Sequence, residues 1–148
     1  MLAKSLIIFI VVGIISGFGI GIYTIDYKSN NQLVFVDGSS ISIVTEKFDF
    51  KQNELIEIKI INSGTNPLTF LNSSCDLNIT GLFGILIYSP VYPPVSFTLD
   101  PMDEVILSWD QIRNNGEFVS AGVYKIFVHG IDSDGNTVKK SATVSIWK

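Results

Sequence analysis

The stretch Ile56-Glu57-Ile58-Lys59-Ile60 places an apolar side chain at every second position, with a charged side chain between them. Successive side chains of an extended strand point to opposite faces of a sheet, so this stretch has one apolar and one charged face. Such alternation predicts a strand with one face in a core and the other in solvent. The surrounding domain is therefore expected to contain β-sheet.

The same period of two recurs along the chain. Tyr124, Ile126 and Val128 alternate with Lys125 and His129, which predicts a second half-buried strand. Apolar or alternating runs predict further strands at residues 33–36, 40–45, 68–71, 84–88, 95–99, 104–109 and 137–147.

Residues that favour turns separate these expected strands. They occur at Asp37-Gly38, Asn62-Ser63-Gly64, Asn114-Asn115-Gly116 and Asp134-Gly135. No amphipathic helical pattern of useful length appears after residue 26. Short strands joined by turns at this spacing predict an all-β fold, an antiparallel β-sandwich of seven to nine strands.

The last predicted turn has two interpretations. Asp132, Asp134 and Asn136 alternate as the first three ligands of a calcium loop do. However, Gly135 stands at the fourth position of such a loop rather than the sixth, and Thr143 occupies the twelfth in place of glutamate. A hairpin turn that needs a positive φ is the better interpretation, and no metal is expected there.

The first 25 residues differ from the rest of the chain. No charged side chain occurs from Ser5 to Ile25, a run of 21 residues. A helix of that length spans about 31 Å, enough to cross a hydrocarbon core of about 30 Å. Residues 1–25 are therefore predicted to form one N-terminal transmembrane helix, residues 26–32 a polar linker, and residues 33–148 the sandwich.

The charges that flank this run predict its orientation. Lys4 and the terminal amine precede it, whereas Asp26 and Lys28 follow it. The slight excess of positive charge at the N-terminus favours a single-pass anchor with the domain on the extracytoplasmic side. One alternative is a cleaved signal peptide, for which the best cleavage pattern, Gly17-Phe18-Gly19, lies inside the run. Another is a filament whose core is this helix.

Gly13, Gly17 and Gly21 lie four residues apart and so share one face of the predicted helix. Small residues at this spacing allow two helices to approach closely in lipid, which would form a homo-oligomer. Glycine is also common in membrane helices that do not pair. Helix pairing therefore remains one of two interpretations.

Two sequons fit a domain exposed outside the cell. They are Asn72-Ser73-Ser74 and Asn78-Ile79-Thr80, in which Asn72 and Asn78 are candidate glycosylation sites. Such triplets also arise by chance in a chain rich in serine and asparagine.

The charge of the predicted domain restricts its partners. Residues 26–148 hold 14 acidic and nine basic side chains, a net charge of −5, and these charges are scattered. Without a stripe of lysine and arginine, nucleic acid and anionic lipid headgroups are not expected as partners.

The residues that usually carry catalysis are few. His129 is the only histidine and Cys75 the only cysteine, and no nucleophile motif surrounds either residue. One histidine and one cysteine are too few for the usual four-ligand zinc site. The chain is therefore predicted not to be an enzyme and to need no cofactor.

Two stretches resemble a known family. The segment 62–70 (Asn-Ser-Gly-Thr-Asn-Pro-Leu-Thr-Phe) looks like a strand turn of extracellular Ig-like modules. Four motifs in order resemble the BsuPI-like domain of intracellular proteinase inhibitors: Leu99-Asp100-Pro101, Trp109-Asp110-Gln111, Gly116-Glu117-Phe118-Val119 and Ala121-Gly122-Val123-Tyr124. The resemblance implies an Ig-like β-sandwich and raises proteinase inhibition as a function. The predicted anchor departs from an intracellular inhibitor and argues against that role.

Trp109 and Tyr124 have a structural explanation that needs no ligand. A tryptophan that ends a strand closes one end of a sandwich, and Gly122-Val123-Tyr124 resembles a tyrosine corner.

One loop carries features of a binding surface. Tyr88-Ser89-Pro90-Val91-Tyr92-Pro93-Pro94-Val95 combines prolines, which fix φ, with tyrosines, which offer contact area at low entropic cost. The candidate binding residues are Tyr88, Pro90, Tyr92, Pro93 and Pro94, and Tyr92 is expected to be exposed. The alternative is a plain crossover in which proline protects a sheet edge.

Three functions are compatible with these observations. The first is a membrane-anchored module, tethered through residues 5–25, whose extracytoplasmic sandwich binds another protein of the cell envelope. The second is a proteinase inhibitor of the BsuPI type. The third is a component of an envelope filament or a motor accessory. An anchor joined to a sandwich without catalytic residues favours the first.

Overall fold

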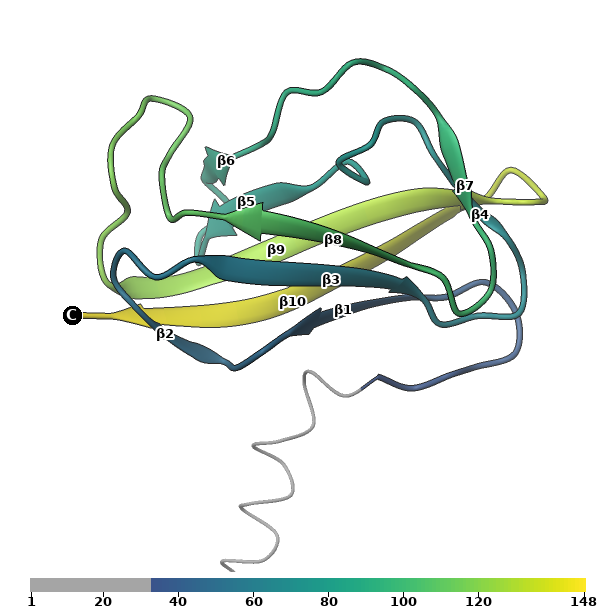
Figure 1. Cartoon of the computed structure of the whole chain (residues 1–148), viewed down its shortest axis with the longest axis horizontal. Helices are drawn as coiled ribbons and strands as arrows, with labels where there is room; N and C mark the ends of the chain where they lie inside the picture. Colours follow the sequence, from purple (N-terminus) through teal and green to yellow (C-terminus); the bar gives the residue numbers. More distant parts are fainter. Residues whose placement is uncertain (1–32) are drawn as a thin grey trace, which may run out of the picture. The chain divides into compact units, whose positions relative to one another are not determined.

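The computed structural model describes residues 33–148, which form ten β-strands in two sheets (Figure 1). Within this range the chain contains no helix, so the all-β prediction is confirmed. The smaller sheet has the order β1 (Ile41–Thr45), β3 (Ile56–Asn62) and β8 (Glu104–Trp109).

The larger sheet is built around the longest hairpin. Its main path is β2 (Asp49–Lys51), β10 (Thr137–Trp147), β9 (Gly122–Asp132), β4 (Leu68–Phe70) and β7 (Phe97–Leu99). The first half of β9 also pairs with β5 (Asn78–Gly81), which in turn pairs with β6 (Leu86–Tyr88).

The burial of side chains along β3 alternates as the sequence predicts. Ile56, Ile58 and Ile60 are fully buried, whereas Glu57 is exposed and Lys59 is half-buried. Burying one such side chain stabilises the fold by about 1.5–3 kcal/mol. The strand pairs with β1 and β8 on its two sides, which makes it the centre of the smaller sheet.

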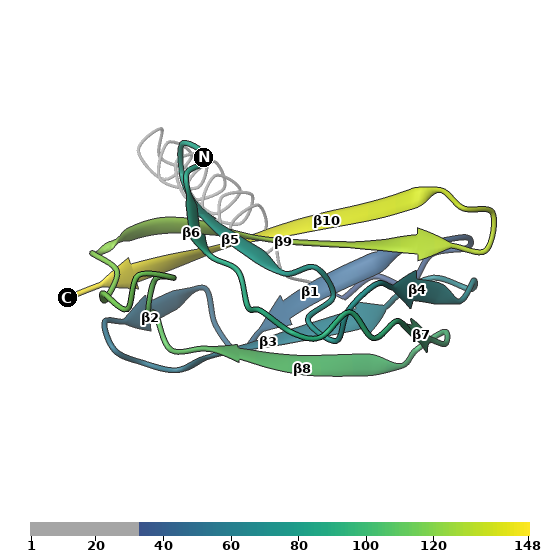
Figure 2. The same cartoon turned by 90° about the horizontal axis from the view of Figure 1, so that it is seen from above.

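The two sheets pack face to face around one core, as the two layers of Figure 2 show. Side chains from both sheets meet in it, among them Ile58 of β3 and Ile126 of β9. Its largest fully buried members are Trp109, Phe50, Phe70, Ile56, Leu68 and Leu77. The domain is thus a β-sandwich in which the strands of each layer turn one face inward.

The β9–β10 connection is a hairpin turn, as expected. Asp132 Oδ1 accepts hydrogen bonds from the backbone N–H groups of Asp134 (3.0 Å) and Asn136 (2.8 Å). The bond from Asn136 is the main reason that the pKa of Asp132 lies below its usual value. Gly135 has a φ of +82°, which glycine adopts without strain. The Asp132 carboxylate therefore stabilises the turn by accepting backbone hydrogen bonds.

The expected tyrosine corner is also present. Trp109 is fully buried at the end of β8 and lies edge-on to the Tyr124 ring, with centroids 5.7 Å apart. The Tyr124 hydroxyl donates to the Ser120 carbonyl at 2.7 Å, and Trp109 Nε1 donates to the Ile112 carbonyl at 3.0 Å. Both motif residues are thus explained by packing and hydrogen bonding.

Three details of the predicted fold are wrong. Residues 33–36 form no strand: their side chains are exposed, and the Val36 N–H bonds to the carbonyl of Ser63, the residue that follows β3 (2.9 Å). The strands number ten rather than seven to nine, since β2 and β5 were missed. The sheets are not wholly antiparallel, because β2 pairs with β10 in parallel.

Candidate functional site

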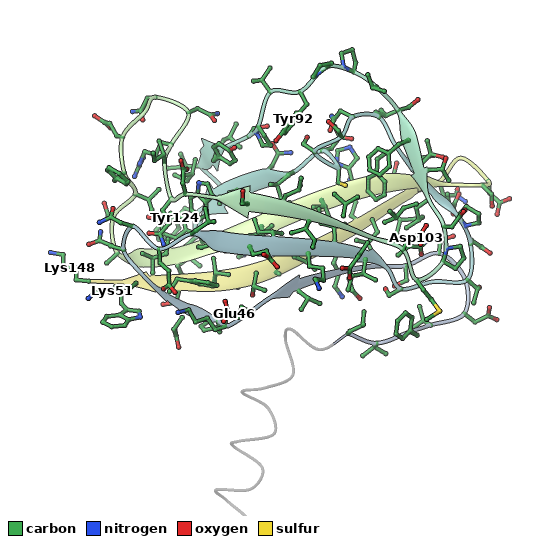
Figure 3. All side chains as sticks on the ribbon, viewed as in Figure 1. Glu46, Lys51, Tyr92, Asp103, Tyr124 and Lys148 are labelled. Carbon is green, nitrogen blue, oxygen red and sulfur yellow. The ribbon has the colours of Figure 1, made fainter. Side chains whose placement is uncertain are left out.

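The connection between β6 and β7 is the most exposed part of the predicted binding loop. Val91 is 98% exposed and Tyr92 49% exposed, and Pro93, Pro94 and Val95 are exposed as well. Tyr92 lies on this outer connection in Figure 3. The expectation that the Tyr92 ring reaches solvent is confirmed.

Hydrogen bonds hold the start of this connection in place. The Ser89 N–H donates to Asn114 Oδ1 at 3.0 Å, and the Asn114 N–H donates to the Ile87 carbonyl at 3.1 Å. Farther along, the Val95 N–H donates to the Pro93 carbonyl at 2.8 Å. These bonds and the fixed φ angles of the prolines limit the conformations of the segment.

Tyr88 and Tyr92 play different parts. The Tyr88 ring is half-buried and stacks on Trp109 with centroids 6.3 Å apart, so it belongs to the foundation of the loop. Burial, followed by the nearby Tyr92 and Asp110, raises the pKa of Tyr88 above its usual value. Of the two rings, only Tyr92 has about half of its surface exposed to solvent. Of the other predicted binding residues, Pro90 is half-buried, and Pro93 and Pro94 are exposed.

No charged side chain occurs from Leu77 to Leu99, the stretch that contains β5, β6, β7 and the loop. Asp76 and Asp100 flank it. A partner that meets this surface would be recognised by apolar contacts and by hydrogen bonds to tyrosine and the backbone.

The backbones of Cys75 and His129 lie side by side, and the surroundings of the thiol do not activate it. The backbone N–H of His129 donates to the Cys75 carbonyl at 3.4 Å, and Nε2 of the His129 ring lies 3.6 Å from Asp76 Oδ2. Cys75 is fully buried, and burial together with the neighbouring Asp76 raises the pKa of its thiol to about 12. The thiol is protonated at neutral pH, whereas nucleophilic cysteines depend on the thiolate.

Within residues 33–148, no three His, Cys, Asp or Glu side chains gather as a metal site requires.

The two candidate glycosylation residues take part in local hydrogen bonds. Asn72 Oδ1 accepts from Ser74 N–H (3.0 Å), Ser74 Oγ (2.6 Å) and Asp76 N–H (3.2 Å), and its Nδ2 donates to the Asp76 carboxylate. Asn78 Nδ2 donates to the Asp76 carbonyl at 3.0 Å. A glycan attached to either amide nitrogen would have to keep or replace these bonds. Glycosylation stays a prediction.

The predicted anchor, the linker and the helix-pairing residues Gly13, Gly17 and Gly21 lie outside the described residues. Among residues 33–148, no helix has the length and hydropathy that a membrane crossing requires.

Sequence reasoning missed a second exposed surface, the tip of the β5–β6 hairpin. Leu82, Phe83, Ile85 and Leu86 are each more than half exposed, and Phe83 reaches 91%. The signal that could have found it is the complete lack of polar side-chain atoms from Gly81 to Leu86.

Comparisons with known proteins find only distant structural similarity. No protein-family model matches the chain, and no curated protein matches it. Among solved structures, it is similar to PorZ, a bacterial surface component of the type-IX secretion system of Porphyromonas gingivalis, with 15% identity, a TM-score of 0.38 and 72% of this chain covered. It is also similar to the sporulation control protein Spo0M of Bacillus subtilis, with 9% identity, a TM-score of 0.46 and 76% of this chain covered.

A third similar structure is the sulfur carrier protein SoxY of Chlorobium limicola, with 11% identity, a TM-score of 0.44 and 86% of this chain covered. The matched regions span 11% of the PorZ chain, 51% of the Spo0M chain and 96% of the SoxY chain.

Proposed function

We propose that this chain is a membrane-anchored, extracytoplasmic Ig-like β-sandwich module that binds another protein of the cell envelope and catalyses no reaction. The observation that carries the proposal is the exposed, conformationally restricted connection of residues 89–95. It offers apolar and aromatic surface with no charge of its own.

Restriction of this loop favours binding, because a segment already held in one conformation loses little entropy when a partner covers it. The bond from Ser89 to Asn114 and the stack of Tyr88 on Trp109 fix one end. Val91 and Tyr92 then stand outside the sandwich with most or half of their surface free. Tyrosine is suited to this position, because its ring combines contact area with a hydroxyl that forms hydrogen bonds.

The state of the catalytic candidates supports a binding role. A protonated, buried Cys75 makes a poor nucleophile, and His129 faces the Asp76 carboxylate. The tether rests on the uncharged run of 21 residues after Lys4. The relation to BsuPI-like domains rests on the motifs between Leu99 and Tyr124, of which Trp109, Gln111 and Tyr124 are buried. Recognition is therefore assigned to the loop rather than to those three motif residues.

Site-specific photo-crosslinking tests this proposal. Tyr92 is replaced by benzoylphenylalanine in the full chain, which is then irradiated in its native membranes. We expect one predominant adduct with an envelope protein, which Val91→Asp in the same chain should abolish. Asp134, in the β9–β10 turn, carries the same photoreactive residue as the matched control and should yield no such adduct. Equal labelling at both positions, or none at Tyr92, would contradict the proposal.

The identity of the adduct separates the main alternatives. If the partner is a protease whose turnover falls when the full chain is added, the module is an inhibitor of the BsuPI type. If the partner is a filament or motor protein, the accessory function replaces the general binding role.

A further inference from the structure

The β5–β6 hairpin ends in an apolar tip, residues 81–86. Its four large side chains, Leu82, Phe83, Ile85 and Leu86, are exposed one after another around a single turn. Figure 2 shows the hairpin standing out from the body of the larger sheet. Exposed apolar clusters of this kind are uncommon on soluble domains and mark surfaces that contact something else.

The turn itself satisfies part of its own backbone. The Gly84 N–H donates to the Gly81 carbonyl at 3.0 Å, and the Gly81 N–H donates to the Ile85 carbonyl at 2.9 Å. Gly84 has a φ of +80°, which allows the chain to reverse within so few residues. Because no side chain of the tip carries a polar atom, moving it out of water leaves no side-chain hydrogen bond unmade.

We propose that this tip inserts into the interfacial layer of a lipid bilayer, as a second membrane contact of the tethered domain. The inference uses the membrane location of the proposed function but is independent of its protein partner. Insertion would bury Leu82, Phe83, Ile85 and Leu86 among lipid groups while the rest of the sandwich stays in water.

Shape and chemistry favour lipid over protein as the occupant. The tip projects from the sheet, and from Gly81 to Leu86 it has no polar side chain to fix a protein's orientation. Protein interfaces normally combine an apolar centre with several hydrogen bonds. A fluid bilayer needs only apolar surface and a shape that can enter it.

Charge selects the kind of lipid. The tip lies inside the stretch from Leu77 to Leu99, which has no charged side chain, so its insertion removes no charge from water. The domain as a whole is acidic and would be repelled by anionic headgroups. The charge distribution therefore favours neutral, zwitterionic lipid such as phosphatidylcholine.

A spin-label experiment on the full chain tests this inference. Phe83→Cys is labelled with a nitroxide, and the protein is reconstituted into phosphatidylcholine vesicles. The native Cys75 remains unlabelled because it is fully buried and its thiol pKa is about 12. Collision of the label with oxygen, which concentrates in the bilayer, is compared with collision with a water-soluble nickel complex.

Labels at two control positions show whether protection of the nitroxide from the nickel complex is specific to the tip. Asp134→Cys probes the distant β9–β10 turn, and Val91→Cys probes the neighbouring loop. We expect the Phe83 label to meet oxygen several times more often, relative to the nickel complex, than either control label does. A Phe83 label as accessible to nickel as the Asp134 label overturns the inference.

Two further measurements separate lipid from other occupants. If diluting the labelled chain with unlabelled chain in the same vesicles removes spin–spin broadening of the Phe83 label, the tip contacts a second copy of the chain, and the lipid proposal fails. In vesicles with half phosphatidylglycerol, we expect shallower insertion, and deeper insertion would overturn the choice of neutral lipid. Since these vesicles contain no envelope protein, failure here is distinct from failure of crosslinking at Tyr92.

Discussion

Gly64 shows how strongly one backbone position constrains the smaller sheet. A Cβ atom built at this residue would lie 2.1 Å from the Gly38 carbonyl oxygen and 2.7 Å from the Ser40 nitrogen. Both neighbours are backbone atoms. Their segment is held by hydrogen bonds from the Thr65 N–H to the Gly38 carbonyl at 2.8 Å and from the Ser63 N–H to the Ser40 carbonyl at 3.1 Å. The close approach explains why glycine follows Asn62-Ser63 in the motif.

We therefore expect Gly64→Ala to destabilise the sandwich by about 1–3 kcal/mol or more, the cost of forcing atoms into a packed region. Gly81→Ala is the matched control, because nothing lies within 4 Å of its Cβ position. The control should change the free energy of unfolding by less than about 1 kcal/mol. Urea denaturation of both variants measures the difference, and equal stabilities would show that residues 38–40 move aside freely.

Cys75 makes a prediction about alkaline pH. Its pKa is raised by burial from 9.0 to about 12, so the unfolded chain loses the thiol proton at a lower pH than the folded chain does. This contribution to stability is complete below about pH 9 and is lost as the pH rises towards about 12. We expect the unfolding free energy to fall more steeply above pH 9 in the native chain than in Cys75→Ala. Parallel pH profiles would contradict the raised pKa.

At the level of the element, the β6–β7 loop separates a structural tyrosine from an exposed one. Tyr92→Ala should change stability by no more than about 0.5 kcal/mol, as surface substitutions usually do. Tyr88→Ala removes a ring that stacks on Trp109 and should cost at least about 1 kcal/mol. Chemical denaturation of the two single variants measures this contrast. A destabilised Tyr92→Ala would mean that this ring supports the loop and does not serve a partner.

The same elements show how far sequence reasoning reaches. The strands with clear alternation, such as β3, β9 and β10, were predicted because their period of two reflects burial directly. β2 was missed because a strand of three residues is too short to show a period of two. Only its middle residue, Phe50, is buried. Residues 33–36 were predicted as a strand because they are apolar, although four exposed apolar side chains reflect neither alternation nor burial.

For the candidate sites too, sequence reasoning reaches features that depend on local residue types and misses those that depend on distant contacts. The proline loop could be found from residue types, because proline and tyrosine have local effects on conformation and contact area. The structural role of Gln111 could not be found in this way, because its buried side chain bonds to Lys51, Asn53 and Glu54, which are far away in the sequence. Contacts of that kind appear only once the loops after β2 and β8 lie side by side.

For the whole molecule, we expect residues 33–148 to fold as an independent unit. They share one core, and that core contains the buried aromatic residues Phe50, Phe70 and Trp109. A fragment of these residues should be soluble, rich in β signal by circular dichroism and cooperative in unfolding. Addition of a chelator should leave the unfolding midpoint unchanged. A midpoint that falls on chelation would revive the calcium interpretation of Asp132, Asp134 and Asn136.

The proposed orientation makes a second prediction at this scale. With Lys4 on the cytoplasmic side, protease added to intact cells or spheroplasts should remove the sandwich. Immunodetection of residues 33–148 before and after lysis measures this, with a cytoplasmic protein as the control for cell integrity. Protection in sealed cells followed by digestion after lysis would reverse the orientation.

The parallel pairing of β2 with β10 has a consequence for the order of events during synthesis. Asp49 pairs with Ser145, so an early strand must wait for nearly the whole domain before its partner exists. A chain that leaves the ribosome or a translocation channel from its N-terminus cannot close the larger sheet until β10 has emerged. Pairing between such distant segments also implies high contact order, for which folding times are about milliseconds to seconds. The domain is thus expected to reach its native topology after the chain has been elongated and not during elongation.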